Sequence, residues 1–329
     1  MQLILDTKGL ELKKSGSAFQ VVFGEKEKRK NRTISPAKLT SIAITANVVL
    51  HSNAVTLAIQ QKIPILFFNN IGKAKARLWS PYFESISTLR RRQVKFTESV
   101  AGTDWMINLF WLKTQGQLHN LNLIKNQRIR SVQLVKRSID SIKTNSKSLD
   151  NYREQLPDMC RNNVMGIEGN IARVYWQAIG NALPRTYRFD KRSRRPAADI
   201  FNAAINYGYG MLYSVVEGGI FAVGMDPHLG IFHVDEYAKP TLAFDLIEPF
   251  RPWVDELIIK ACLTGTLQKE FFTSNQFGIF FNKKGKAWLI PAFNEMLRSK
   301  RKFLDRENTV KNHIYQLSAS LARRMRTRE

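Results

Sequence analysis

The hydrophobic pattern of the chain changes near Glu84, and this change limits the folds that the sequence can adopt. Before it, short runs such as LILD, LELKK and AFQVVF favour strands and are separated by Lys-Gly and Ser-Gly-Ser turns. After it, long segments such as TDWMINLFWLKTQGQLHNLNLIKNQ repeat their apolar residues with helical periodicity. A chain of 329 residues is long enough for about two domains. We therefore predict an α+β protein, with a small β-rich N-terminal domain at residues 1–84 and a larger, nearly all-α domain at residues 85–329.

The charge of the chain restricts its partners. Lys and Arg number 51 against 27 Asp and Glu, which gives a formal net charge of +24, while 44% of the residues are hydrophobic. This ordinary apolar content indicates folded domains rather than a basic disordered tail. A folded protein this positive repels itself unless a polyanion neutralises it. Nucleic acid is the usual polyanion, and an anionic membrane surface is the other candidate.

Three further features restrict the compartment. The sequence has no run of about 18 apolar residues, so we expect no membrane span. The opening residues MQLILDTKGLELKK place charges where a signal peptide needs an apolar core. The chain has only two cysteines, Cys160 and Cys262, which is typical of a reduced compartment, and they form no CxxC pair that would indicate a structural zinc site. We therefore expect a cytoplasmic protein that does not engage a membrane.

One carboxylate stands on an apolar helix face in the segment DMCRNNVMGIEGNIARVYWQAIGNAL. Ile171 and Tyr175 lie at helical spacing from Glu168. A buried carboxylate needs a cationic partner, which can be a basic side chain or a metal ion. Gly166 and Gly169 flank Glu168, and each weakens a helix interior by about 1 kcal/mol relative to Ala. Their presence suggests that another helix or a phosphate backbone comes close.

The segment GIFHVDEYAKPTLAFDLIEPFRPWVD places one histidine and two acids close together. His233 follows a turn, and Asp245 and Glu248 lie three residues apart on one face of a predicted helix, unless Pro249 breaks that helix at Glu248. Close acids raise each other's pKa unless a cation lies between them. Carboxylates with one imidazole suit Mg²⁺ or Mn²⁺. The spacing alone is a weak motif, and a lone histidine is often structural, so the metal hypothesis depends on the polyanion partner as well.

Two basic segments are candidates for contacts with DNA phosphates. RTYRFDKRSRRP interleaves aromatic and basic residues after the Glu168 helix, and LRRRQVK lies at the domain junction. Such side chains give salt-dependent affinity without sequence preference, or else they form a solvated face. The candidate DNA-binding residues are Arg185, Arg188, Lys191, Arg192, Arg194 and Arg195 in the first segment and Arg90, Arg91 and Arg92 in the second.

Three segments together carry a resemblance to a known family. MGIEGNIARVYW, FDKRSRRPAADIFNAAINYGYGMLYSVV and GMDPHLGIFHVDEYAKPTLAFDLIEPFRPWVD resemble the CRISPR-associated integrase-endonucleases of spacer acquisition, the CRISPR adaptation integrase family. The segment ISPAKLTSIAITANVVLHSNAVTLAIQQKIPILFFNNIGKAKARLWSP resembles the end of that family's β-domain. The resemblance covers nearly the whole chain.

The resemblance implies a metal-dependent DNA endonuclease and integrase that joins prespacer 3′-OH ends to a CRISPR repeat by transesterification. It implies that Glu168, His233 and Asp245 are the catalytic metal ligands for Mg²⁺ or Mn²⁺. It matches Glu248 to a further acidic position, which either binds the metal as a fourth residue or orients its shell. It makes the α-helical domain catalytic and gives dimerisation and partner contacts to the β-rich domain. It also implies a homodimer that binds DNA with a small second adaptation protein.

Two alternatives stay open at this point. A non-catalytic, basic DNA-binding or architectural protein explains the net charge, but it does not explain an acid on an apolar helix face together with a nearby histidine. A transposon-borne integrase of the same fold would perform the same reaction on other DNA ends. The sequence identifies neither the repeat nor the spacer length.

Overall fold

The computed structural model describes residues 2–24, 29–39, 41–68, 74–78, 87–127, 131–194, 196–233 and 239–326, and it divides the chain into two compact units. Unit 1 is Met1–Phe83 and unit 2 is Glu84–Glu329, a division one residue from the boundary expected from the sequence. Each unit has its own hydrophobic core. Strands dominate the first unit and helices the second, so the predicted fold class is confirmed.

Unit 1 contains two four-stranded sheets. Its elements are β1 Gln2–Leu5, β2 Glu11–Ser15, β3 Ala18–Phe23, β4 Lys30–Ile34, η1 Pro36–Lys38, β5 Ser41–Ile44, β6 Val49–Leu50, α1 Ser52–Gln60, β7 Ile65–Phe68 and β8 Ala74–Leu78. The first sheet has the order β1-β5-β7-β8, with parallel pairing except between β7 and β8. The second has the order β4-β3-β2-β6, with antiparallel pairing except between β2 and β6.

Alternating burial explains why these segments form strands. In β3, Phe19 and Val21 are buried while their neighbours are less so, which is the period of a strand with one face on a core. The core of unit 1 is closed by side chains from both sheets, including the fully buried Leu12, Ile42 and Ile65. These contacts bury apolar surface that the short strands could not bury alone.

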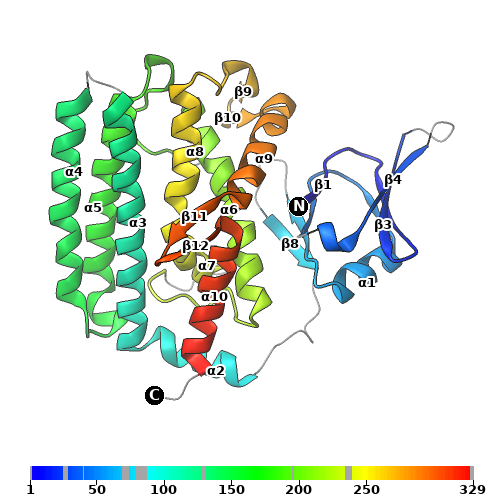
Figure 1. Cartoon of the computed structure of the whole chain (residues 1–329), viewed down its shortest axis with the longest axis horizontal. Coiled ribbons are helices and arrows are strands. Elements are labelled where there is room, and N and C mark those ends of the chain that lie inside the picture. Colours follow the sequence, from blue (N-terminus) through cyan, green and yellow to red (C-terminus); the bar gives the residue numbers. More distant parts are fainter. Residues whose placement is uncertain are drawn as a thin grey trace. The chain divides into compact units, whose positions relative to one another are not determined.

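Unit 2 is built mainly from helices. They are α2 Ser87–Thr97, α3 Val100–Gln127, α4 Val132–Lys147, η3 Ser148–Tyr152, α5 Pro157–Ala182, η4 Arg185–Tyr187, α6 Ile200–Ala222, α7 Thr241–Leu246, η5 Glu248–Phe250, α8 Arg251–Leu263, η6 Lys269–Phe271, α9 Lys283–Arg298 and α10 Val310–Arg326. Helices α3, α4 and α5 all pack against one another, while α6 packs against α8 and α10 (Figure 1). Helix α3 also contacts α8 and η5, so it connects the two groups.

Glycines let two helices approach α8 closely. A Cβ atom at Gly116 on α3 would lie 2.6 Å from Pro252 Cβ, and one at Gly208 on α6 would lie 2.7 Å from Val254 Cγ1. Any larger residue at either position would push the helices apart. The start of α8 is therefore packed closely between α3 and α6, and the preceding η5 packs against α3. This region carries part of the site described below.

Unit 2 also contains two short antiparallel hairpins. They are formed by β9 Phe272–Asn275 with β10 Gly278–Phe281, and by β11 Lys300–Phe303 with β12 Arg306–Thr309. Four-residue strands are too short for their periodicity to stand out in a helical sequence, which is why a nearly all-α domain was expected. Among the described residues, no helix is both long enough and apolar enough to cross a membrane.

Candidate active site

A cavity of about 770 Å³ opens in unit 2, and residues of α3, α5, α6, α7, η5 and α8 line it. Lys113 from α3 and Glu168 from α5 line it, together with His233 and Glu248. Three of the four predicted metal-binding residues therefore share one cavity. The fourth, Asp245, is fully buried and is not part of the cavity wall.

Lys113 connects the two acids of the cavity. Its ammonium group forms ion pairs with Glu168 Oε1 and Glu248 Oε2. The three residues meet because both α5 and η5 pack against α3. Burial alone would lower the pKa of Lys113, but the charges of Glu168 and Glu248 raise it above its usual value. Lys113 is therefore charged, and it is the cation that two neighbouring carboxylates require.

Glu248 has a second cationic partner. Arg251 Nε donates to Glu248 Oε1 at 2.9 Å, and Arg251 Nη2 donates to Tyr213 Oη at 2.6 Å. The guanidinium also lies over the ring of Tyr209, 4.7 Å from its centroid. Burial alone would raise the pKa of Glu248, but Arg251 and Lys113 lower it to about 2. Glu248 is therefore ionised at neutral pH although it is buried.

Asp245 orients His233 and the loop that carries it. Its Oδ2 accepts from the backbone N–H groups of Ile231 at 2.6 Å and Phe232 at 3.3 Å, and its Oδ1 accepts from that of His233 at 3.2 Å. The same Oδ1 lies 2.7 Å from His233 Nδ1. Burial alone would lower the pKa of His233, but its bond to Asp245 raises it. When Nδ1 donates to Asp245, Nε2 is the ring nitrogen left for the cavity.

Asp245 and Glu248 do not share one helical face, because the helix breaks at Glu248, which is the alternative that Pro249 left open in the sequence. Asp245 lies in α7, whereas Glu248 begins the tighter η5, where Pro249 interrupts the helix. As a result Glu248 lines the cavity, while both oxygens of Asp245 are used by backbone amides and by His233. The geometry gives Asp245 the position of a histidine-orienting carboxylate rather than that of a direct ligand.

The donor groups of the cavity suit a hard divalent cation. Two carboxylates and an imidazole nitrogen are ligands that Mn²⁺ accepts, and carboxylates are ligands that Mg²⁺ accepts. Glu168 and Glu248 already converge on one cation, since both pair with the Lys113 ammonium. Within the described ranges, no group of three or more His, Cys, Asp or Glu side chains is arranged to hold a metal ion. The residue types fit a metal, and Lys113 lies where the carboxylates meet.

Gly166 and Gly169 bring no helix of this chain close to α5. A Cβ atom at either position would have no neighbouring atom within 4 Å. Gly169 lines the cavity beside Glu168, whereas Gly166 does not. Of the two reasons considered for these glycines, packing against another helix of the described chain is therefore wrong for both.

Lys113 and Arg251 were not predicted from the sequence. With 51 basic residues in the chain, neither stands out by type. A signal was present for Lys113, because it is the charged residue within the apolar run NLFWLKTQ, and it is only 8% exposed. Arg251 could have been noticed three residues after Glu248, where a helical ion pair is possible.

A second buried acid lies near the cavity. Asp255 accepts hydrogen bonds from the hydroxyl groups of Tyr209 at 2.6 Å and Tyr175 at 3.1 Å. Its burial raises its pKa to about 6, although the tyrosine hydrogen bonds oppose that rise. Asp255 belongs to the wall of the cavity but was not recognised in the sequence.

The first basic segment divides into exposed and structural residues. Arg192 is half-buried, lies over the ring of Trp176, and donates from Nη2 to Asn206 Oδ1 at 2.9 Å. Tyr187 and Phe189 are buried in the core, so these aromatic residues are not free to stack on bases. The exposed candidates are Arg185, Arg188, Lys191 and Arg194, while Arg195 lies outside the described residues.

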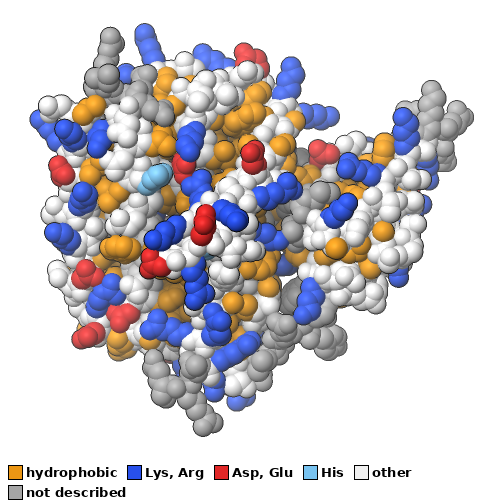
Figure 2. Space-filling view, in the orientation of Figure 1, with side chains coloured by type: hydrophobic (Ala, Val, Ile, Leu, Met, Phe, Trp, Pro, Cys, Tyr) orange, Lys and Arg blue, Asp and Glu red, His pale blue; other side chains and the backbone are white. Residues whose placement is uncertain are grey.

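The second basic segment lies on α2. Arg90 and Arg91 are exposed, whereas Arg92 is half-buried and donates to the backbone carbonyl oxygen of Arg326. Figure 2 shows that Lys and Arg side chains are spread widely over the visible face, with fewer Asp and Glu side chains among them. The exposed arginines thus contribute to a generally positive surface rather than to an isolated patch.

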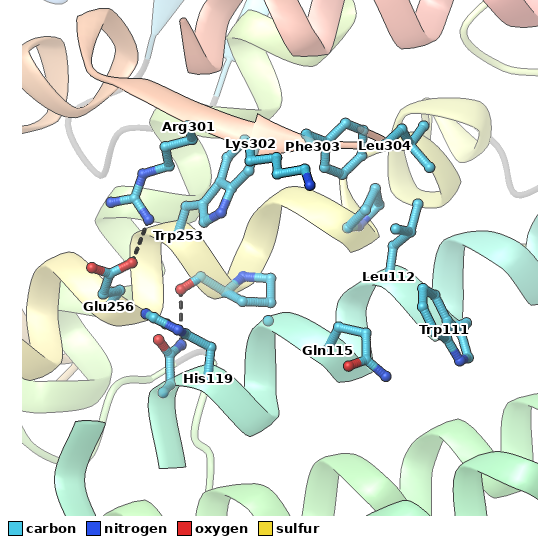
Figure 3. A pocket seen from close by; sticks show the side chains of 14 residues that line it. Trp111, Leu112, Gln115, His119, Trp253, Glu256, Arg301, Lys302, Phe303 and Leu304 are labelled. Atoms are coloured by element: carbon cyan, nitrogen blue, oxygen red, sulfur yellow. Dashed lines mark hydrogen bonds and ion pairs between the residues drawn. The ribbon is translucent and has the colours of Figure 1, made fainter. Parts of the chain in front are cut away.

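A different cavity, of about 390 Å³, lies between α3, α8 and β11 (Figure 3). Trp111 and Leu112 come from α3, and Phe303 and Leu304 come from the second hairpin. Glu256, at its edge, is paired with Arg301 and with Lys260, which is 2.5 Å away. None of the residues predicted as metal ligands or DNA contacts lines this cavity.

The first cavity defines a class of protein. Converging acids, an oriented histidine and several arginines in a strongly basic chain form the kind of centre that enzymes use for phosphoryl transfer on nucleic acids. The chain belongs to the CRISPR associated protein Cas1 family, whose model matches residues 3–295. This confirms the family expected from the three sequence segments.

Relatives and solved structures agree with this assignment. CRISPR-associated endonuclease Cas1 1 of Archaeoglobus fulgidus is 27% identical in an alignment of 296 residues, and the match covers 85% of this chain and 85% of that protein. A casposase bound to its integration product is similar with a TM-score of 0.76 at 20% identity, over 98% of this chain and 90% of that chain. A Cas6-RT-Cas1–Cas2 complex is similar with a TM-score of 0.77 at 20% identity, over 99% of this chain and 35% of that chain. The structural matches establish a shared fold.

Proposed function

We propose that this protein is a divalent-metal-dependent DNA endonuclease and integrase of CRISPR adaptation. The observation that carries the proposal is the convergence of Glu168, Glu248 and His233 on one cavity of a chain with a net charge of +24. The relatives named Cas1 endonucleases support a nuclease. The metal would be Mg²⁺ or Mn²⁺.

The proposed reaction is a transesterification at phosphorus. The 3′-OH oxygen of a prespacer end attacks a phosphodiester of the repeat, a new P–O bond forms, and the bond to the leaving 3′ oxygen breaks. The proton of the attacking hydroxyl group ends on the leaving oxygen, so the step needs neither water nor an external energy source. With water as the nucleophile, the same centre would act as an endonuclease.

We assign roles to the residues from their positions. Glu168, Glu248 and His233 Nε2 would hold the metal ion, which when bound supplies Lewis-acid activation of the phosphate. Asp245 would keep His233 in the tautomer and orientation that direct Nε2 into the cavity. This set differs from the one implied by the resemblance, because Glu248 replaces Asp245 as a ligand.

The DNA path would use the basic residues around the cavity. Arg173 and Arg194 line it and are exposed, so they can reach phosphates near the scissile bond. Arg185, Arg188 and Lys191 are exposed on the neighbouring segment, and Arg90 and Arg91 on α2. They would supply salt-dependent affinity along the duplex.

The proposed protein partners are Cas2 and a second copy of this chain. The similarity to a chain in a Cas1–Cas2 complex supports a small second adaptation protein, Cas2. The proposed reaction favours a homodimer, because a DNA fragment with two ends needs two active sites. The β-rich unit 1 is the proposed region for dimerisation and partner contacts.

A strand-joining assay with a short DNA duplex, a target DNA and Mn²⁺ tests this function. Glu168→Gln, Glu248→Gln and His233→Ala should each lower joining by at least about 100-fold while DNA affinity stays within a few-fold. The matched control is Glu256→Gln, which breaks ion pairs with Lys260 and Arg301 at the other cavity. Joining that survives in the three site variants would favour a non-catalytic, DNA-binding architectural protein.

A transposon-borne integrase is the second candidate, because a casposase shares the fold over nearly the whole chain. The two functions differ in the DNA that is the target. Joining assays on a CRISPR repeat and on the same DNA with a scrambled repeat distinguish them. Preference for the repeat supports the adaptation role, and equal joining to both supports the transposon-type role.

A further inference from the structure

Lys113 occupies the meeting point of the two proposed ligands. It is 8% exposed, and its ammonium group pairs with both Glu168 and Glu248. These two carboxylates provide the hydrogen bonds that the described residues make to its side chain. A metal ion held by both carboxylates would have to share this position with the ammonium group or replace it.

The local charges favour replacement. Glu168 and Glu248 carry two negative charges, and Lys113 and Arg251 carry two positive charges, so the cluster is neutral. Adding a divalent ion to the intact cluster would leave two excess positive charges in a site of low dielectric, which is costly. If Lys113 moves away from the two carboxylates as the metal arrives, the groups that remain beside the metal carry an excess of one positive charge, which one substrate phosphodiester then balances.

Lys113 is also the cation that can move more readily. Arg251 is held at three points: by Glu248, by the Tyr213 hydroxyl group at 2.6 Å, and by stacking on Tyr209. Lys113 has a flexible four-carbon stem and a compact charge without such a stack. The two cations of Glu248 therefore differ in how firmly they are anchored.

Gln117 provides a place to which the ammonium group can move. It lies one helical turn after Lys113 on α3, lines the same cavity, and is 2% exposed. Its Oε1 has no hydrogen-bond partner among the described residues. A buried acceptor without a partner is costly, so this atom needs an explanation in the working protein.

We propose that Lys113 is a displaceable counter-ion, which holds Glu168 and Glu248 together before a divalent metal ion binds and then moves to Gln117 Oε1. In the metal-free protein the ammonium group prevents the two acids from repelling each other. In the metal-loaded protein it remains at the cavity wall. The proposal rests on the proposed metal site and goes further by describing how that site is kept ready.

Calorimetric titration of Mn²⁺ into the full-length protein tests the proposal without an activity assay. Lys113→Met should tighten Mn²⁺ binding by about tenfold or more, because the competing unit charge is gone. The same variant should unfold at a lower temperature than wild type in EDTA, and added Mn²⁺ should raise its melting temperature more than that of wild type. The matched control is Lys260→Met, which removes a lysine from the buried Glu256 and should leave Mn²⁺ affinity unchanged.

Gln117→Met separates displacement from a simple charge effect, since Gln117 is uncharged. We expect this variant to bind Mn²⁺ about three- to tenfold more weakly, because the displaced ammonium group loses its acceptor. Its stability in EDTA should equal or exceed that of wild type. This variant also tests the proposal if Lys113→Met does not fold.

The outcomes distinguish the proposed metal site from the counter-ion role of Lys113. If wild-type protein binds no Mn²⁺, the proposed function loses its metal. If wild type binds Mn²⁺ but Lys113→Met binds it no more tightly, or Gln117→Met binds it equally well, the counter-ion role is overturned and the metal site stands.

Discussion

Asp245 and Glu248 lie three residues apart, yet they are stabilised in opposite ways. Asp245 is held by the His233 side chain and by three backbone N–H groups, and these N–H groups cannot leave without unfolding the loop. Glu248 is held by the side chains of Lys113 and Arg251, which can change rotamer. Backbone donors therefore make one acid structural, and side-chain cations leave the other available for chemistry.

The strongest test of this comparison is Asp245→Ala. It leaves three buried amides and a histidine without their acceptor, so we expect a loss of about 3–5 kcal/mol in the free energy of unfolding. Urea denaturation at pH 7 measures it. The control is Asp226→Ala, which removes a similar Asp–His pair at the surface, where Asp226 accepts from His228 N at 2.9 Å. Equal losses of stability in the two variants would contradict the structural role of Asp245.

The lowered pKa of Glu248 predicts how the free energy of unfolding changes in acid. The pKa of Glu248 is about 2 in the folded protein, against 4.5 for an unperturbed Glu side chain. A carboxylate whose pKa is lowered by folding stabilises the protein above the unfolded pKa and loses that contribution as pH falls through the folded pKa. The contribution is about 3 kcal/mol, lost between about pH 4.5 and 2. Glu248→Gln should flatten this part of the pH–stability curve, and an unchanged slope would contradict the ion pairs described.

Asp255 is a third buried acid for this comparison, because side-chain hydroxyl groups donate to it instead of backbone amides. Its folded pKa of about 6 lies above the ordinary value of 3.8. The folded state therefore binds more protons between these values, and stability should fall by about 3 kcal/mol as pH rises from about 4 to 6. Asp255→Asn should remove this slope in urea denaturation across that range. If the slope persists in the variant, another group causes the pH dependence.

The smallest expected effect comes from Gly169, on the cavity side of α5. Gly169→Ala places a methyl group in open space and should stabilise the helix by about 1 kcal/mol. If a DNA backbone approaches Glu168 there, strand joining should nevertheless fall. Gly166→Ala is the matched control, because that position is equally open but lies outside the cavity. Equal joining by both variants would place the DNA elsewhere.

Much of the architecture could be predicted from local patterns. The change of periodicity near Glu84 indicated the two units, and the apolar stripe around Glu168 indicated the helix that carries it. The three quoted segments were sufficient to recognise the family. Short hairpins such as β9–β10 were missed, since four residues give too little periodicity.

From the sequence alone we could predict candidates for chemistry, namely Glu168, His233 and two acids near the same proline-rich stretch. Which acid faces the cavity and which cation pairs with it depend on the tertiary structure. Lys113 lies 55 residues from Glu168 and 135 from Glu248 in the chain, so no local pattern links them. Helical spacing reports which residues share a face, whereas ion pairs depend on how separate helices pack, and that packing is a property of the whole core.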